Sequence, residues 1–295
     1  MKVATGTIVS VIAGYYFVEH DEQIYLCRGR GKLRKEGKPL TGDKIRFSFK
    51  VGEETGTVEE ILPRRNQLQR PAVANVDAVI IVIAAESPEP DLLLLDKLLA
   101  FLVAQGLEAL LCVNKADLNS ARAAAWAALY GEIGFPAVTC SALTGQGLDE
   151  LVHLIGAKTV VFAGQSGVGK TQLTAIIAAE QLDLPLRVGE LSAKIGRGRH
   201  TTRQVTLLPL ASGGKVADTP GFSVFDIELE SRGLHRFFPE FHQFAQACYF
   251  SPCLHIHEPD CAVKAHLQKG EINTGRYENY LKIYQELKQK EADRY

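Results

Sequence analysis

Residues 164–171 read GQSGVGKT, which matches the pattern G-x-x-x-x-G-K-[S/T]. The apolar run before them predicts a buried strand, and the residues after them predict a helix, which is the setting that a phosphate-binding P-loop requires. The glycines let backbone N–H groups turn inward around phosphate oxygens, and the helix N-terminus favours negative charge. A chance glycine-rich turn is the alternative, and the correct flanking elements argue against it.

This P-loop assigns individual roles to its residues. Lys170 is expected to reach the β- and γ-phosphates and to act in catalysis, and the hydroxyl of Thr171 to ligate Mg²⁺. The remaining expected phosphate-binding residues are Gly164, Gln165, Ser166, Gly167, Val168 and Gly169.

The residues around the P-loop alternate between two hydrophobic patterns. The expected strands are 76–85, 108–117, 135–140 and 159–164, and the expected helices are 91–106, 120–131, 147–156 and a helix from Lys170. Strands that alternate with helices indicate a parallel sheet with helices on both faces.

Two further loops point to guanine. NKAD at 114–117 follows an apolar strand; Asp117 can accept both the ring N–H and the amine of guanine, while Asn114 braces the loop and Lys115 lies over the purine. A helix cap is the alternative for this string alone. The loop with Ser141 and Ala142 follows the next strand and offers backbone N–H groups to the guanine oxygen, so the pair favours GTP over ATP.

DTPG at 218–221 ends a predicted strand downstream of the P-loop. Asp218 is expected to hold Mg²⁺ through water, and the Gly221 N–H to touch the γ-phosphate. A surface turn is the alternative for this motif taken alone. In GRGRHTTRQ, Thr201 and Thr202 are the candidates for a threonine at Mg²⁺ and the γ-phosphate, and we favour Thr202, which we also count as catalytic.

The motifs occur in an unusual order. Ras-like GTPases begin with the P-loop, whereas here NKAD and the Ser-Ala loop precede it. Cutting and rejoining a closed domain at another loop preserves its site, so the sequence predicts a circularly permuted P-loop GTPase. The order also places two expected switch segments, 189–204 and 218–226, directly before the C-terminal region, which suggests that loss of the γ-phosphate moves that region.

Phe222 follows DTPG where Ras-like enzymes carry the glutamine that orients the attacking water. We therefore expect slow intrinsic hydrolysis unless another group takes this role. His200 is the candidate, with a surface histidine as the alternative. The neighbouring Arg197, Arg199 and Arg203 are either a solvated loop face or a phosphate- or partner-binding group.

Residues 1–61 alternate short runs of β-branched and aromatic residues with Gly or Asp turns, which predicts a small all-β barrel. The first 70 residues contain 13 Lys and Arg against 9 Asp and Glu, although the whole chain has a net charge of −1. Six of these basic residues share one glycine-containing loop: Arg28, Arg30, Lys32, Arg34, Lys35 and Lys38. The polar stretch from 61 to 74 is expected to be a linker or arm.

The C-terminal part predicts helices around a Cys/His-rich loop, and three of the six cysteines fall in this loop. Three thiolates and one imidazole make a closed, structural zinc site. The expected ligands are Cys248, Cys253, His255 and Cys261, with His257 as a nearby polar group. Buried free thiols are the alternative. We expect the metal to supply much of the stability of this small module.

Taken together, these elements resemble the RsgA (YjeQ) family of circularly permuted GTPases: the barrel with GDKI at 42–45, RRNQLQRPAVANVD, NKAD, GQSGVGKT, GRGRHTT, DTPGF and CYFSPCLHIHEPDCAV. Thr171 replaces the serine common in that family. The resemblance implies an OB-fold over residues 1–70 that binds RNA, a GTPase domain over 71–228 and a zinc-binding domain over 229–295. It also implies late maturation of the small ribosomal subunit, with rRNA as partner and hydrolysis stimulated by the ribosome.

Two other classes compete with this reading: a P-loop ATPase or kinase, and a non-hydrolysing RNA-binding protein with a vestigial nucleotide domain. NKAD argues against the first, and the intact Lys170 and Asp218 argue against the second. No export signal or run of about 18 apolar residues is seen, so we expect a cytoplasmic monomer without membrane contact.

Overall fold

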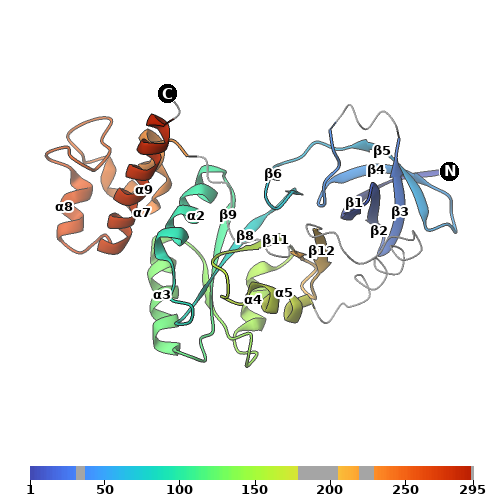
Figure 1. Cartoon of the computed structure of the whole chain (residues 1–295), viewed down its shortest axis with the longest axis horizontal. Helices are drawn as coiled ribbons and strands as arrows, with labels where there is room; N and C mark the ends of the chain where they lie inside the picture. Colours follow the sequence, from blue (N-terminus) through green and yellow to red (C-terminus); the bar gives the residue numbers. More distant parts are fainter. Residues whose placement is uncertain (31–36, 179–204, 219–228, 294–295) are drawn as a thin grey trace. The chain divides into compact units, whose positions relative to one another are not determined.

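The structure is a computed structural model that describes residues 1–30, 37–178, 205–218 and 229–293 (Figure 1). The chain forms two compact units. The first comprises Met1–Ile80, Thr144–Ala163 and Gly169–Ser223, and the second comprises Ile81–Leu143, Gly164–Val168 and Val224–Tyr295. Each is described by itself below.

Five strands at the start of the first unit close into a barrel. They are β1 (Lys2–Ile12), β2 (Tyr15–His20), β3 (Gln23–Gly29), β4 (Lys44–Phe49) and β5 (Thr55–Ile61). The strands follow one another in the order β1, β2, β3, β5, β4, and β4 pairs back to β1. The β3–β5 pair is parallel, and the other four pairs are antiparallel. This is the predicted barrel, and its five strands have an OB-like arrangement.

Alternate barrel residues point inward and exclude water. The core contains Ile8, Val18, Tyr25, Cys27, Ile45, Phe47, Phe49 and Val58. Gly56 lies where a Cβ atom would come within 2.9 Å of the Cys27 sulfur and 3.0 Å of the Ser48 carbonyl oxygen. Only glycine fits at this close approach.

The stretch expected to be a linker contains a short hairpin of β6 (Gln67–Leu68) and β7 (Val73–Ala74). It is tied to the barrel by Arg64, whose Nε lies 2.6 Å from Oδ1 of the fully buried Asp43. Asp43 raises the pKa of Arg64 through this hydrogen bond. The arm is therefore an ordered part of the first unit.

The first unit also contains β11 (Thr159–Ala163), β12 (Thr206–Pro209) and β13 (Lys215–Asp218), with α4 (Leu148–Ile155) and α5 (Lys170–Ala178). In this part the sheet runs β11, β13, β12, β1. β11 and β13 are parallel, whereas β12 is antiparallel to both β13 and β1. The barrel strand β1 thus continues the sheet that carries the P-loop strand.

The second unit contains the parallel strands β9 (Glu108–Asn114) and β10 (Ala137–Thr139), with α2 (Leu92–Ala104) and α3 (Ser120–Ile133). β8 (Ala78–Ala84) is the next strand beside β9, and all of its residues are buried. Burial of every residue means that both faces of the strand are covered, as in the parallel sheets of α/β proteins. The predicted alternation of strands and helices is confirmed.

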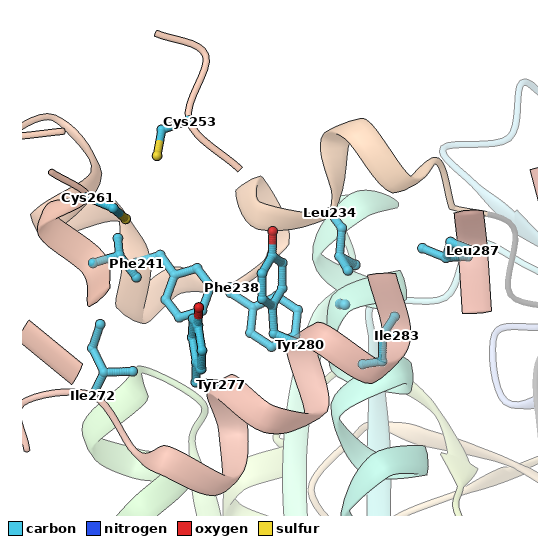
Figure 2. Close-up of a cluster of buried hydrophobic side chains, with 12 residues drawn as sticks. Leu234, Phe238, Phe241, Cys253, Cys261, Ile272, Tyr277, Tyr280, Ile283 and Leu287 are labelled. Atoms are coloured by element: carbon cyan, nitrogen blue, oxygen red, sulfur yellow. The ribbon is translucent and has the colours of Figure 1, made fainter. Parts of the chain in front are cut away.

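The C-terminal part of this unit consists of η2 (Ser231–Phe237), α7 (Pro239–Ala245), α8 (Ala262–Gln268) and α9 (Thr274–Ala292). Figure 2 shows Phe238, Phe241, Tyr277 and Tyr280 gathered beside Cys253 and Cys261. Ala100 of α2 belongs to the same buried cluster. The predicted helical module is present, and it has a larger apolar core than its length suggested because α2 contributes to it.

No helix in the described part of the chain has the length and hydropathy of a membrane-spanning segment.

Candidate functional site

Asn114 stands at the end of β9, and its side chain is fully buried. Its Oδ1 accepts a hydrogen bond from the Ala142 N–H at 3.0 Å, and its Nδ2 donates to the Val168 carbonyl oxygen at 2.8 Å. One amide therefore joins the loop after β9, the Ser-Ala loop and the first half of the P-loop. This is the bracing role expected of the asparagine in NKAD.

The two charged residues of NKAD lie nearer the surface than this brace. Asp117 is exposed, and its Oδ1 accepts a hydrogen bond from the Ser141 hydroxyl at 2.5 Å. Lys115 has a φ of 61°, and its Nζ donates to the Ser87 carbonyl oxygen at 2.5 Å. The arrangement leaves a carboxylate edge beside a lysine stem, which suits a ring with two adjacent N–H donors.

The first half of the P-loop has the backbone that its glycines predict. Gly164 has a φ of 127°, and a Cβ atom there would lie 2.2 Å from the Val82 carbonyl oxygen. Gly167 has a φ of 82°. The side chain of Gln165 accepts a hydrogen bond from the Asp91 N–H at 3.3 Å, at the start of α2. The loop is therefore shaped by β8 beneath it and held by α2 at its side.

In the first unit, Lys170 and Thr171 begin α5 and Asp218 ends β13. Burial lowers the pKa of Lys170 and raises that of Asp218. Each shift disfavours the charged form of the side chain. Phosphate oxygens beside Lys170 would stabilise its charged form. A divalent cation near Asp218 would do the same for that carboxylate. The hydroxyl of Thr171 and the carboxylate of Asp218 are hard oxygen donors, the kind that Mg²⁺ prefers.

Five residues expected at the site lie outside the described residues. They are His200, Thr201, Thr202, Gly221 and Phe222, and the basic residues Arg197, Arg199 and Arg203 lie there too.

The four residues expected to hold a metal come together in the C-terminal part. The sulfur atoms of Cys248, Cys253 and Cys261 and a ring nitrogen of His255 all lie within 4.8 Å of one another. The Cys248 and Cys261 sulfurs are 3.9 Å apart, and Nδ1 of His255 lies 3.6 and 3.4 Å from them. A tetrahedral zinc site with its usual bond lengths requires about 3.8 Å between sulfurs and about 3.5 Å between sulfur and nitrogen. The cluster therefore fits zinc.

His255 presents the chemical form that a metal requires. Burial lowers its pKa to about 4, so the imidazole is neutral near pH 7. His257 is exposed and does not belong to the cluster. Of the two histidines, His255 lies with the sulfurs, and its backbone adopts a φ of 61°.

The loop around these ligands is held by Tyr277, which no motif identified, and by Glu258, which lies in CYFSPCLHIHEPDCAV without an assigned role. The Tyr277 hydroxyl donates to the His255 carbonyl oxygen at 2.7 Å, and the carboxylate of Glu258 accepts from the N–H groups of Leu254 and Ile256. Ser87 and Asp91, which contact Lys115 and Gln165, also belong to no motif. The only sequence signal for such supports is the clustering of tyrosines in the last expected helix.

Comparison with known proteins agrees with this arrangement. The family model described as RsgA GTPase matches residues 61–228, and the RsgA N-terminal domain matches residues 5–58. A small ribosomal subunit biogenesis GTPase RsgA of Caldanaerobacter subterraneus subsp. tengcongensis is 45% identical over 100% of this chain and 99% of its own. A protein of the same name from Moorella thermoacetica is 45% identical over 96% of this chain and 97% of its own.

Two solved structures are similar over nearly the whole chain. YloQ, titled a circularly permuted GTPase, has a TM-score of 0.79 and 31% identity and covers 98% of this chain and 96% of its own. YjeQ from Thermotoga maritima has a TM-score of 0.79 and 34% identity and covers 97% of this chain and 99% of its own. With these matches over the barrel, the permuted motifs and the C-terminal module, the chain belongs to the RsgA family of circularly permuted GTPases.

Proposed function

We propose that this protein binds the small ribosomal subunit during late maturation and hydrolyses GTP to GDP and phosphate there, with hydrolysis stimulated by the ribosome. The names of its relatives support the partner, because they are small ribosomal subunit biogenesis GTPases. The observation that carries the nucleotide assignment is the buried amide of Asn114, which bonds both the Ser-Ala loop and the P-loop. A guanine site needs these loops fixed before the base arrives.

In this proposal each motif has one task. Asp117 accepts the two guanine donors, Lys115 covers the purine, and the N–H groups of Ser141 and Ala142 meet the guanine oxygen. The backbone from Gly164 to Gly169 surrounds the phosphates. Because adenine lacks these two donors, ATP would leave the oriented carboxylate of Asp117 without its partners.

Binding of the GTP phosphates depends on opposite charges in the site. Lys170, whose pKa burial lowers, is stabilised in its charged form by the β- and γ-phosphates. Mg²⁺ neutralises charge on the β- and γ-phosphate oxygens when bound. Thr171, Asp218 and one of Thr201 and Thr202 would hold it, Thr202 being favoured, and the Gly221 N–H would contact the γ-phosphate. His200 would orient the attacking water, since the side chain of Phe222 has no polar atom.

We infer a structural zinc ion on Cys248, Cys253, His255 and Cys261. The donor distances support it, and no donor is left over for a substrate or water. Bound zinc supplies a cross-link between the loop after α7 and the start of α8. Tyr277 and Glu258 hold the backbone of that loop and so orient the ligands.

The barrel is the proposed rRNA-binding part. Arg28, Arg30 and Lys38 are exposed at its third strand and the loop that follows. The Arg28 guanidinium lies 4.7 Å from the centre of the Tyr15 ring. Exposed cations beside an aromatic ring suit a phosphate backbone with unstacked bases. We assign residues 1–70 to this RNA-binding domain with its linker, 71–228 to the GTPase domain and 229–295 to the zinc-binding domain, and we propose a cytoplasmic monomer.

The decisive experiment measures GTP turnover by the full chain with and without purified small ribosomal subunits. We expect slow turnover alone and strong stimulation by the subunits, with His200→Ala losing the stimulated rate. Titration with mant-GTP and mant-ATP tests the base, and tight binding of mant-ATP would favour an ATPase. Absence of turnover in both conditions would contradict the enzymatic proposal and favour an RNA-binding protein with an inactive nucleotide domain.

A further inference from the structure

The hairpin of β12 and β13 places Asp218 under the influence of a neighbouring strand. Thr206, the first residue of β12, is the register partner of Asp218, the last residue of β13. On its other side β13 pairs with β11, from Thr159 to Val161. Among the described residues, β12 is therefore the strand that supports Asp218 at its own level.

The barrel reaches β12 at the same level. Ser10 of β1 is the register partner of Thr206, and its Oγ lies 3.1 Å from Thr206 Oγ1 and 3.5 Å from the Val205 carbonyl oxygen. Ser10, Thr206 and Asp218 thus form one line across three adjacent strands, and this line joins the barrel to the aspartate of DTPG.

A second barrel hydroxyl holds the same backbone. Thr41, in the loop before β4, donates from Oγ1 to the Val205 carbonyl oxygen at 3.1 Å. Its own main chain is fixed, because its carbonyl oxygen accepts from the Ala74 N–H at 2.9 Å. Ser10 is 0% exposed and Thr41 3% exposed. Since a buried hydroxyl without a partner is costly, both residues favour the register of β12 in which these bonds are made.

We propose that Ser10 and Thr41 are positioning residues that couple the barrel to GTP hydrolysis: they hold β12 in register and thereby set the position of Asp218. The inference rests on the proposed role of Asp218 at Mg²⁺. It follows that a macromolecule bound to the barrel acts on the hydrolytic site along the line from Ser10 to Asp218, separately from the guanine loops.

The test compares the full-length wild type with the double variant Ser10→Ala, Thr41→Val. The Mg²⁺ concentration for half-maximal GTP turnover should rise about fivefold for each hydroxyl removed, the effect of one ordinary hydrogen bond. The stimulation of GTP turnover by purified small ribosomal subunits should fall in the same variant. The affinity for mant-GDP in EDTA should not change, because Ser10 and Thr41 belong to none of the guanine-binding loops.

Ser48→Ala is the matched control. Ser48 is a buried serine of the same barrel, 3% exposed, but its hydroxyl bonds Glu59 at 2.6 Å within the barrel. It should leave the Mg²⁺ requirement unchanged. Thr206→Val combined with Ser10→Ala should cost less than the sum of the two single changes, because both remove the same contact.

A folded double variant with the wild-type Mg²⁺ requirement and full stimulation would overturn the proposal, as would an equal loss in Ser48→Ala. If the double variant does not fold, Ser10→Ala and Thr41→Ser decide the matter: the first should raise the Mg²⁺ requirement and the second, which keeps its hydroxyl, should not. Failure of the proposed function has a different signature. If the subunits do not stimulate the wild type, the protein has another partner. If the wild type shows no turnover, the role of Ser10 and Thr41 is tested by the Mg²⁺ dependence of mant-GTP binding.

Discussion

Arg276 of α9 donates from Nη1 to Oδ1 of Asp96 on α2 at 2.5 Å, and the two side chains are 2% and 0% exposed. Asp96 also accepts from the Tyr130 hydroxyl at 2.9 Å and from Asn279 at 2.7 Å. The other edge of the guanidinium donates to Glu240 at 2.7 Å. Burial lowers the pKa of Arg276, but the two carboxylates outweigh it and the net shift is upward. A charged network therefore fastens the C-terminal helices to α2.

Arg276→Met should destabilise the protein severely. The change leaves the buried carboxylate of Asp96 without its cation, and breaking a buried ion pair in this way costs about 3–5 kcal/mol. Chemical denaturation followed by circular dichroism measures the loss. Lys97→Met is the matched control on the same helix: Lys97 pairs with Glu286, but their side chains are 23% and 47% exposed, so the loss should stay below about 1 kcal/mol. Equal losses would show that the network is not what holds α9.

Asn114→Ala should weaken guanine nucleotide binding. It removes both bonds of the buried amide, which leaves the Ala142 N–H and the Val168 carbonyl oxygen unpaired. We expect mant-GDP affinity to fall by about 10- to 100-fold. Asn119→Ala is the control, since Asn119 caps α3 by accepting a hydrogen bond from the Arg122 N–H at 3.0 Å. It should cost about 1 kcal/mol of stability and leave the affinity unchanged.

Asp117→Asn should change the preferred base. Guanine presents two adjacent donors, whereas xanthine presents one donor and one acceptor, which matches the amide of asparagine. We expect GTP affinity to fall by at least about 10³-fold and affinity for xanthosine triphosphate to rise. Competition against mant-GDP measures both. A variant that keeps its preference for GTP would show that Asp117 does not read the base.

Metal analysis should find one zinc ion per chain, held by the Cys/His cluster. A thiol reagent should react slowly with Cys27, because it is fully buried and burial raises its pKa to about 12. A strong chelator should release the zinc and expose Cys248, Cys253 and Cys261 to the reagent. Cys253→Ser should lose the metal and lower the unfolding temperature, and Cys27→Ser should keep the metal. Full zinc content in Cys253→Ser would contradict the assigned ligand set.

The parts of the fold that repeat a local pattern could be predicted from the sequence. β8 was visible as an uninterrupted apolar run, and GQSGVGKT marked the strand before it and the helix after it. The Cys/His cluster was visible because thiols and imidazoles are rarely clustered by chance.

The contacts between distant segments could not be predicted in this way. Ser10 and Thr206 are separated by 196 residues, and each is an ordinary strand residue until the register brings the two hydroxyls together. Asp96 stands out in the sequence because it interrupts an apolar helix. Its partner Arg276 does not stand out, because it lies in a helix with many charged residues. Pairing across such distances is decided by tertiary packing and leaves no local pattern.

The separation of Asp96 and Arg276 by 180 residues also has a consequence in time. At ordinary rates of synthesis, Asp96 leaves the ribosome roughly 10–40 s before Arg276 does. During that interval the carboxylate of Asp96 can accept a hydrogen bond from Tyr130, but its cation Arg276 is missing. The contact between Asp96 and Arg276 cannot form until α9 has emerged, so the packing of α9 on α2 is a late step in the folding of a nascent chain.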